Sequence, residues 1–359
     1  VAAKIGPGLR PAQVDGYAHI QTPVSYGFVH SPRELVILNS TASQVVREAP
    51  AARVALRPAQ ALVAHPLRAP VPLRPAPDLP RLQLQSPAEL LQFWFSFGDS
   101  YTQTGFSVTG TQPSSSNALG NPPYPGYTAC GSYPNWVDYL AFTLNTTLVK
   151  VYNHAYGGAT IDSALVTPYQ STVKCLDDQV ADFLNYNAPG KQYNAGWSSA
   201  NTLFSIWIGI NDIGNTYWNG SGLNDTLLNR YFELIQQLYA AGARNFLFLT
   251  VPPIYRSPLM LSQATSARDQ EKVVIDDYNS KLATRAAAFA SSHSGVTTKV
   301  YDTTTIVNAM LNNPSSYGLQ DATSYGNGPY AWCNDYHISP IVHQKIAQGI
   351  APLIQGTFI

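Results

Sequence analysis

Short runs of residues that favour β-structure alternate with helical patterns along the chain from about residue 91 to its end. They have the length of strands and are rich in aromatic and β-branched side chains, which favour buried β-structure. We predict strands at residues 93–97, 150–153, 203–210, 246–251 and 298–301.

Stretches with helical periodicity lie between and after these runs, at residues 136–144, 225–241, 267–291, 304–311 and 340–354. Strands that alternate with helices indicate an α/β domain whose parallel sheet is covered on both faces. In such sheets ligands bind beyond the carboxyl ends of the strands. Residues that carry chemistry are therefore expected just after each strand.

Residues 1–90 have a different composition from the rest of the chain. They contain 13 of the 27 prolines but only three aromatic residues, Tyr17, Tyr26 and Phe28. Such a segment buries too little apolar surface to offset the entropy lost on ordering its backbone. We expect residues 1–90 to be a Pro/Ala/Arg-rich, poorly ordered extension and residues 91–359 to form the folded domain. A pro-region, a basic adhesive arm and translated upstream sequence are the alternative interpretations of this extension.

The charges of the whole chain cancel, with 21 basic and 21 acidic residues. The first 90 residues hold nine of the basic and five of the acidic groups, so the folded domain is mildly acidic. This balance argues against a nucleic-acid-binding protein, which would carry a clustered basic surplus. The longest apolar runs, residues 203–210 and 246–251, are too short to span a bilayer.

Ser100 stands directly after the first predicted strand, in the run FGDSY. A serine at such a turn can present its hydroxyl above the sheet, but it needs a base to become a nucleophile. The G-x-S-x-G pattern is absent because position 102 is Thr. The serine therefore becomes a candidate nucleophile only together with other motifs.

Three further motifs lie where the topology predicts chemistry. Gly158, after the second strand, belongs to a glycine pair that lets a backbone N–H approach a ligand closely. Asn211 follows the third strand, where its amide can donate a hydrogen bond to a developing oxyanion. His337 precedes the last helix and can serve as the base for Ser100, whereas His154 and His343 are more readily explained as structural.

These four motifs, in this order, resemble those of the GDSL/SGNH hydrolase superfamily, which contribute a Ser, a Gly, an Asn and a His. Finer features resemble the fungal carbohydrate esterases of family 16, acetyl esterases that act on plant-wall saccharides. They are residues 98–108 (GDSYTQTGFSV), 121–127 (NPPYPGY), 135–140 (NWVDYL), 153–160 (NHAYGGAT) and 209–215 (GINDIGN). The resemblance covers about residues 91–359 and implies a three-layer, flavodoxin-like α/β fold with a mostly parallel five-stranded sheet.

The resemblance also implies roles for individual residues. Ser100 matches the nucleophile and His337 the general base. The backbone N–H groups of Ser100 and Gly158, with the side chain of Asn211, match the oxyanion hole. The reaction implied is hydrolysis of an acetyl ester through an acyl-enzyme, with no metal and no other cofactor.

The chain departs from the family pattern at the acidic residue, which usually stands three positions before the histidine. Asn334 occupies that position, and the nearest carboxylate is Asp335. We expect Asp335 to orient His337 after a small backbone adjustment. The alternative is a Ser–His dyad in which Asn334 or a backbone carbonyl holds the imidazole, with less stabilisation of the imidazolium.

Two features bear on the compartment. Cys130, Cys175 and Cys333 fit no zinc or redox motif, and one disulfide with one free thiol is possible, with the pairing open. Sequons for N-glycosylation start at Asn39, Asn145, Asn219 and Asn224. Together with the few charges and the many Tyr, Asn, Ser and Thr residues of the domain, they favour a secreted glycoprotein.

The sequence thus predicts a secreted serine esterase whose partner is an acetylated oligosaccharide or another small ester, with no nucleic acid and no membrane span. Two rival functions stay open. One is a lipase or phospholipase-type acyl hydrolase on the same scaffold. The other is a carbohydrate-binding protein whose catalysis has decayed, motivated by Asn334.

Overall fold

A computed structural model describes residues 93–355 of the chain. The prediction about residues 1–90 lies outside the described residues. A five-stranded parallel sheet forms the centre, in the order β2-β1-β3-β4-β5. Its strands are β1 (Phe93–Gly98), β2 (Lys150–Asn153), β3 (Thr202–Trp207), β4 (Asn245–Leu249) and β5 (Thr297–Tyr301). The predicted α/β fold with a parallel five-stranded sheet is confirmed.

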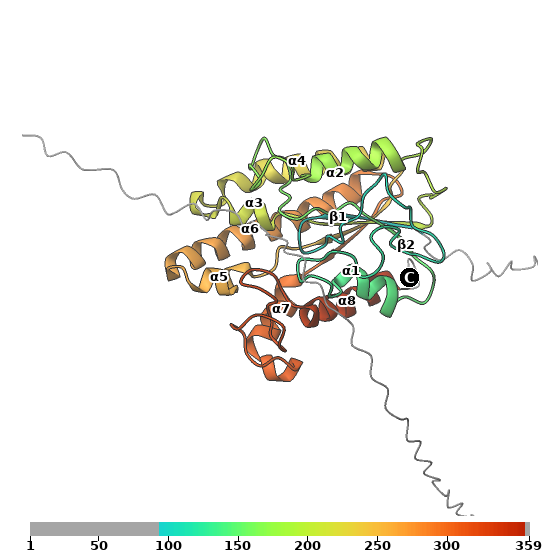
Figure 1. Cartoon of the computed structure of the whole chain (residues 1–359). Coiled ribbons are helices and arrows are strands. Elements are labelled where there is room, and N and C mark those ends of the chain that lie inside the picture. The colour runs from blue at the N-terminus through green and yellow to red at the C-terminus, as the bar shows by residue number, and fades with distance from the viewer. Residues whose placement is uncertain (1–92, 356–359) are drawn as a thin grey trace, which may run out of the picture. The chain divides into compact units, whose positions relative to one another are not determined.

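The helices form one layer on each face of this sheet, so the molecule has the three layers that the sequence predicts. α2, α4 and α6 lie on one face, and α1, α7 and α8 lie on the other (Figure 1). The helices are α1 (Trp136–Asp138), α2 (Leu176–Asp182), α3 (Ile210–Gly214), α4 (Asn224–Ala240), α5 (Pro258–Leu261), α6 (Thr265–Ser292), α7 (Thr303–Asn312) and α8 (Pro340–Ile354).

The register of the sheet brings the carboxyl ends of three strands to one edge. β1 pairs with both β2 and β3, with Ser96 opposite Asn153 and Gly98 opposite Trp207. The loops that follow these strands therefore emerge side by side, and they carry the Ser100, Gly158 and Asn211 motifs.

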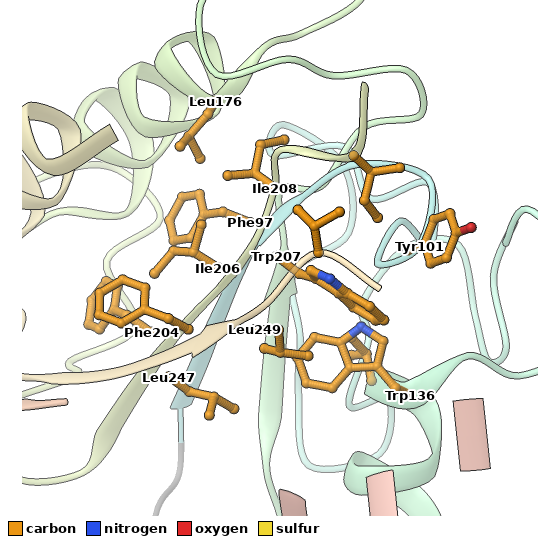
Figure 2. Packing of buried hydrophobic residues seen from close by; sticks show 14 of the residues in the cluster. Phe97, Tyr101, Trp136, Leu176, Phe204, Ile206, Trp207, Ile208, Leu247 and Leu249 are labelled. Carbon is orange, nitrogen blue, oxygen red and sulfur yellow. The ribbon is translucent and has the colours of Figure 1, made fainter. Parts of the chain in front are cut away.

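The largest fully buried side chains of the core are aromatic. Figure 2 shows Trp207 of β3 packed near Trp136 of α1, with their ring centroids 6.0 Å apart. Each buried indole has a hydrogen-bond acceptor: Trp207 donates to the carbonyl of Thr250 at 2.9 Å and Trp136 to the hydroxyl of Thr102 at 3.2 Å. Burial of these rings fixes the loop after β1 against the sheet.

In two predicted elements the backbone conformation changes before the apolar pattern ends. The third strand stops at Trp207 rather than residue 210, because Gly209 has a φ of +115° and Ile210 already begins α3. The helix predicted at 136–144 is one short α-helical turn followed by a π-helical turn, Tyr139–Thr143. In both places an apolar run continues across a change of backbone conformation, so the pattern alone does not mark the boundary.

The three cysteines pair as one disulfide and one thiol. Cys130 and Cys333 are bonded, and Cys175 is buried as a free thiol at the start of α2. The disulfide joins the loop after β1 to the segment before α8, which are 203 residues apart in sequence.

One sequon is unsuitable for glycosylation in this fold. Asn224 is 1% exposed, and its amide nitrogen donates to the carbonyl of Val274 and to the carboxylate of Asp277. A glycan on that nitrogen would break both hydrogen bonds and unpack α4 from α6. Asn39 lies outside the described residues, which leaves Asn145 and Asn219, both at least partly exposed.

Among the helices of residues 93–355, none is long and apolar enough to cross a membrane.

Candidate active site

Ser100 lies in a tight turn that begins where β1 ends. Gly98 has a φ of +153°, and a Cβ there would lie 2.3 Å from the carbonyl oxygen of Trp207, so only glycine fits. The carbonyl of Asp99 accepts hydrogen bonds from the N–H groups of Thr102 and Gln103, each at 3.0 Å. This turn leaves Ser100 partly exposed at the carboxyl edge of the sheet.

Side-chain amides from three other segments hold this turn in place. Asn135 and Asn153 both donate to the carbonyl of Thr102, at 3.0 and 2.7 Å. Gln179 of α2 accepts from the N–H of Gly98 at 2.9 Å and donates to its carbonyl at 2.8 Å. The backbone on both sides of Ser100 is thereby fixed.

Gln179 was not identified from the sequence. α2 itself was missed, because the run LDDQVAD is only seven residues long and a lone Gln carries no motif. Its function in the fold appears only when α2 is packed on β1.

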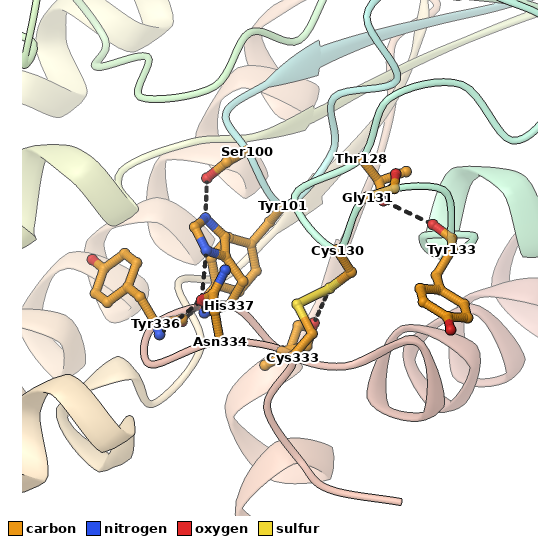
Figure 3. The surroundings of a disulfide bond; sticks show 11 residues. Ser100, Tyr101, Thr128, Cys130, Gly131, Tyr133, Cys333, Asn334, Tyr336 and His337 are labelled. Carbon is orange, nitrogen blue, oxygen red and sulfur yellow. Dashed lines mark hydrogen bonds between the residues drawn. A yellow bond between two sulfur atoms is a disulfide. The ribbon is translucent and has the colours of Figure 1, made fainter. Parts of the chain in front are cut away.

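The imidazole of His337 is within hydrogen-bond distance of the Ser100 hydroxyl. Its Nε2 lies 2.8 Å from the Ser100 hydroxyl oxygen, as Figure 3 shows. Burial lowers the pKa of His337 to about 4, because the protein interior disfavours the charged imidazolium. The ring is therefore neutral near pH 7 and its Nε2 can accept the serine proton.

The side chain at the other ring nitrogen is Asn334, and the expected role of Asp335 in orienting His337 stays a prediction. The Oδ1 atom of Asn334 lies 3.0 Å from Nδ1 of His337 and accepts the backbone N–H groups of Tyr336 and His337 at 2.9 and 2.7 Å. These bonds turn the Asn334 side chain back over its own loop and under the imidazole (Figure 3). Asp335 instead contributes its backbone carbonyl to the N–H of Leu259 at 2.8 Å.

This contact sets the tautomer of the imidazole. The carbonyl oxygen of Asn334 accepts a hydrogen bond, so Nδ1 carries the proton and Nε2 has a free lone pair toward Ser100. An amide provides this orientation without the negative charge that would stabilise the imidazolium. The family position three residues before the histidine is thus geometrically occupied, but by a neutral side chain.

The predicted oxyanion residues lie on loops that are tied to one another. Gly158 has a φ of +81° in the loop after β2. Asn211, at the start of α3, donates from its amide nitrogen to the carbonyl of Ala159 at 2.9 Å, which keeps its side chain next to Gly158. The buried carboxylate of Asp212 accepts the N–H of Ile161 at 3.0 Å and adds a second bond between these loops.

The disulfide lies beside the histidine loop. Cys333 immediately precedes Asn334, and its N–H donates to the carbonyl of His337 at 2.9 Å (Figure 3). The covalent bond to Cys130 therefore anchors the loop that carries both Asn334 and His337.

Two carboxyl groups near the turn are buried. Desolvation raises the pKa of Asp99 to about 8, although the N–H of Tyr101 donates to it, and raises that of Asp212 to about 7. Asp99 is therefore largely protonated at neutral pH and does not place a full negative charge beneath Ser100.

Other titratable groups have structural explanations. His154 is buried against Phe97, and His343 is buried near Tyr101; desolvation lowers their pKa values to about 4 and 3. Within residues 93–355 the side chains close enough to share a metal ion are Cys175, Asp177 and Asp178. Asp178 caps α2 by accepting the N–H of Cys175, so this group is part of a helix start.

Comparison with known proteins agrees with the motifs. Residues 95–350 match the family described as GDSL-like lipase/acylhydrolase. An acetylesterase of Thermothelomyces thermophilus is 44% identical over 272 residues, covering 74% of this chain and 89% of that protein. An acetylesterase of Hypocrea jecorina is 29% identical over 175 residues, covering 45% of this chain and 49% of that protein. An acetylxylan esterase structure from Geobacillus stearothermophilus matches with a TM-score of 0.45 and 16% identity, over 76% of this chain and 97% of that chain.

The family match covers most of the described domain, and the relative from Thermothelomyces is aligned over nearly its whole length. The chain therefore belongs to the GDSL-like lipase/acylhydrolase family and is a carboxylic ester hydrolase.

Proposed function

We propose that this protein is a serine acetyl esterase that deacetylates plant-wall saccharides of the hemicellulose type. The observation that carries the mechanism is the hydrogen-bonded series Ser100 Oγ, His337 Nε2 and, from Nδ1, Asn334 Oδ1. Support for the acetyl group comes from the 44% identical relative, which is named an acetylesterase.

In the first half of the reaction, Ser100 Oγ attacks the ester carbonyl carbon while His337 Nε2 takes the serine proton. The negative charge that develops on the carbonyl oxygen is stabilised by the N–H groups of Ser100 and Gly158 and by the Asn211 amide. Each such donor contributes about 3 kcal/mol in serine hydrolases. His337 then gives its proton to the sugar oxygen, and the sugar leaves.

In the second half, water gives a proton to His337 and attacks the acetyl group on Ser100. The tetrahedral intermediate collapses as its bond to Ser100 Oγ breaks and His337 returns the proton to that oxygen, which gives the free serine, the neutral imidazole and acetic acid, which ionises to acetate. Asn334 keeps its hydrogen bond to the Nδ1–H of His337 throughout, so that only Nε2 takes up and releases protons and His337 serves as base and acid alternately.

The decisive experiment compares the wild type with Ser100→Ala. We expect the wild type to release acetate from acetylated xylo-oligosaccharides and to hydrolyse p-nitrophenyl acetate, and the variant to lose at least about 1000-fold in kcat. A rate that does not depend on Ser100 would leave a carbohydrate-binding protein as the better explanation.

The acyl preference separates an esterase from a lipase. We expect kcat/KM on p-nitrophenyl esters to fall as the acyl chain lengthens from acetate to dodecanoate. A preference for the long chains would contradict the acetyl esterase proposal and favour a lipase on the same scaffold.

We also propose that the protein is secreted. The Cys130–Cys333 disulfide supports this, because such bonds persist mainly in oxidising compartments. Mass analysis of protein recovered from culture medium tests both secretion and glycans at Asn145 and Asn219.

A further inference from the structure

Beside the candidate oxyanion hole lies a tyrosine ring that no motif singled out. A Cβ built on Gly158 would lie 2.3 Å from Cε1 and 2.5 Å from Cδ1 of Tyr169. The ring of Tyr169 therefore packs directly against the backbone of Gly158, in the space that any other residue at 158 would fill. Despite this contact, Tyr169 is 63% exposed.

A second tyrosine flanks the same glycine. The N–H of Tyr156 donates to the carbonyl of Gly98 at 3.1 Å, and the carbonyl of Tyr156 accepts the N–H of Ala159 at 3.1 Å. Its backbone is thus fixed between the nucleophile turn and the oxyanion loop, while its side chain is 37% exposed. Tyr156 and Tyr169 are close enough to interact electrostatically.

The loop after β1 also contacts the glycine pair. The Oε1 atom of Gln103 lies 2.4 Å from where a Cβ of Gly157 would stand, and its Nε2 donates to the carbonyl of Tyr127 at 3.3 Å. Tyr127 is 68% exposed. Gln103 thus lies against Gly157 and links the glycine pair to the backbone of Tyr127, whose ring packs on Gly105.

The charge pattern indicates what such a surface would bind. Residues 101–137 contain no Asp, Glu, Lys or Arg, and neither do residues 151–161 or 163–173. An open aromatic surface without ionic groups suits an uncharged ligand that presents both C–H faces and hydroxyl groups, which describes a pyranose ring. An acyl chain would instead need an enclosed apolar pocket, and a ring that is 63% exposed does not enclose one.

The reaction geometry places a sugar within reach of this surface. The ester oxyanion must lie within about 3 Å of the Gly158 N–H. The carbon that bears this oxyanion is joined to the sugar through a single ester oxygen. We propose that Tyr169, with Tyr156 beside it, forms a stacking subsite for the pyranose ring that carries the acetyl group. This subsite rests on the proposed function, since it presumes that the substrate is an acetylated saccharide.

The test measures selectivity in Tyr169→Ala, Tyr169→Phe and the wild type. The measured quantity is kcat/KM on acetylated xylo-oligosaccharides divided by kcat/KM on p-nitrophenyl acetate, which has no sugar. We expect Tyr169→Ala to lower this ratio about tenfold, which corresponds to about 1.4 kcal/mol, mainly through KM for the saccharide, because the stacking contact is lost. Tyr169→Phe retains the ring and is expected to keep most of the ratio.

Tyr193→Ala is the matched control. Tyr193 is partly exposed and stacks on Tyr186 at 6.1 Å, but it lies in the segment that leads into the start of β3, at the opposite edge of the sheet. We expect its ratio to equal that of the wild type. Calorimetric titration of the saccharide into Ser100→Ala, with and without Tyr169→Ala, measures the same subsite without turnover and is expected to show about tenfold weaker binding.

Three results would overturn the subsite. Equal losses on both substrates in Tyr169→Ala would mean that the ring only supports Gly158. An unchanged ratio would mean that the sugar does not touch Tyr169, and a gain on p-nitrophenyl butyrate or octanoate would make the ring a wall of the acyl site. Failure of the proposed function is distinguishable, because the wild type itself would then not release acetate from the saccharide.

Discussion

At the scale of the residue, the candidate site differs from a charged triad by one amide. Asn334 Oδ1 occupies the place of a carboxylate oxygen at His337 Nδ1, so the imidazole is oriented but not paired with a charge. The acid–base behaviour of His337 therefore depends on burial, which lowers its pKa to about 4.

This pKa predicts the pH profile of the enzyme. The base must be neutral, so kcat/KM is expected to hold from neutral pH down to about pH 5 and to fall as the pH drops through 4. Asn334→Asp keeps the shape of the side chain and adds a carboxylate at Nδ1, which should raise the pKa of His337 by about one to three units. The acid limb of kcat/KM, measured by acetate release, should move upward by the same amount.

Asp335→Asn is the control for that experiment. Since Asn334 holds Nδ1, removing the charge at 335 is expected to leave kcat within about twofold and to leave the acid limb in place. A large loss of kcat, or a shift of the acidic fall in kcat/KM to lower pH, would show that Asp335 orients His337.

At the scale of the element, the site depends on helices and loops that carry no catalytic group. α2 supplies Gln179, which is fully buried and satisfies both the N–H and the carbonyl of Gly98. Gln179→Ala would leave the N–H of Gly98 without this acceptor, at about 1–3 kcal/mol, while the carbonyl of Gly98 would keep the N–H of Tyr156 as a donor. We expect the free energy of unfolding to fall by about 1–3 kcal/mol and kcat to fall with it, because Ser100 is two residues away.

Chemical denaturation of Gln179→Ala, monitored by circular dichroism, measures the loss. Gln237→Ala on the exposed side of α4 serves as control, because it changes the same side chain in a helix without touching the site. An equal effect of the two substitutions would show that Gln179 matters only as a helix residue.

The same scale explains what the sequence predicted and what it missed. The five strands were found because each is a short run rich in β-branched or aromatic residues. Ser100, Gly158, Asn211 and His337 were found because each follows such a run or precedes a periodic helix. α2 was missed because it is only seven residues long, so its buried apolar positions, Leu176 and Val180, make a single helical repeat. The choice between Asn334 and Asp335 depends on how one side chain folds back over its loop, which adjacent positions in a sequence do not specify.

At the scale of the whole molecule, the two ends of the domain meet at the disulfide. Cys130 belongs to the loop between β1 and α1, and Cys333 to the segment before α8, so the bond closes a loop of about two hundred residues. The free energy that such a bond contributes comes mainly from restricting the unfolded chain and is typically about 2–5 kcal/mol. Because Cys333 also precedes Asn334, the bond has a local role that a distant disulfide would not have.

These two roles predict separate effects in the double variant that carries Cys130→Ser and Cys333→Ser. The loss of chain restriction should lower Tm, with the size of the effect read from thermal unfolding. The loss of the local anchor should lower kcat at temperatures where the variant is still folded, because Asn334 and His337 then sample orientations away from Ser100. If kcat is unchanged while Tm falls, the disulfide stabilises the domain without positioning the histidine, and the hydrogen bonds of Asn334 to its own loop are sufficient to hold the base.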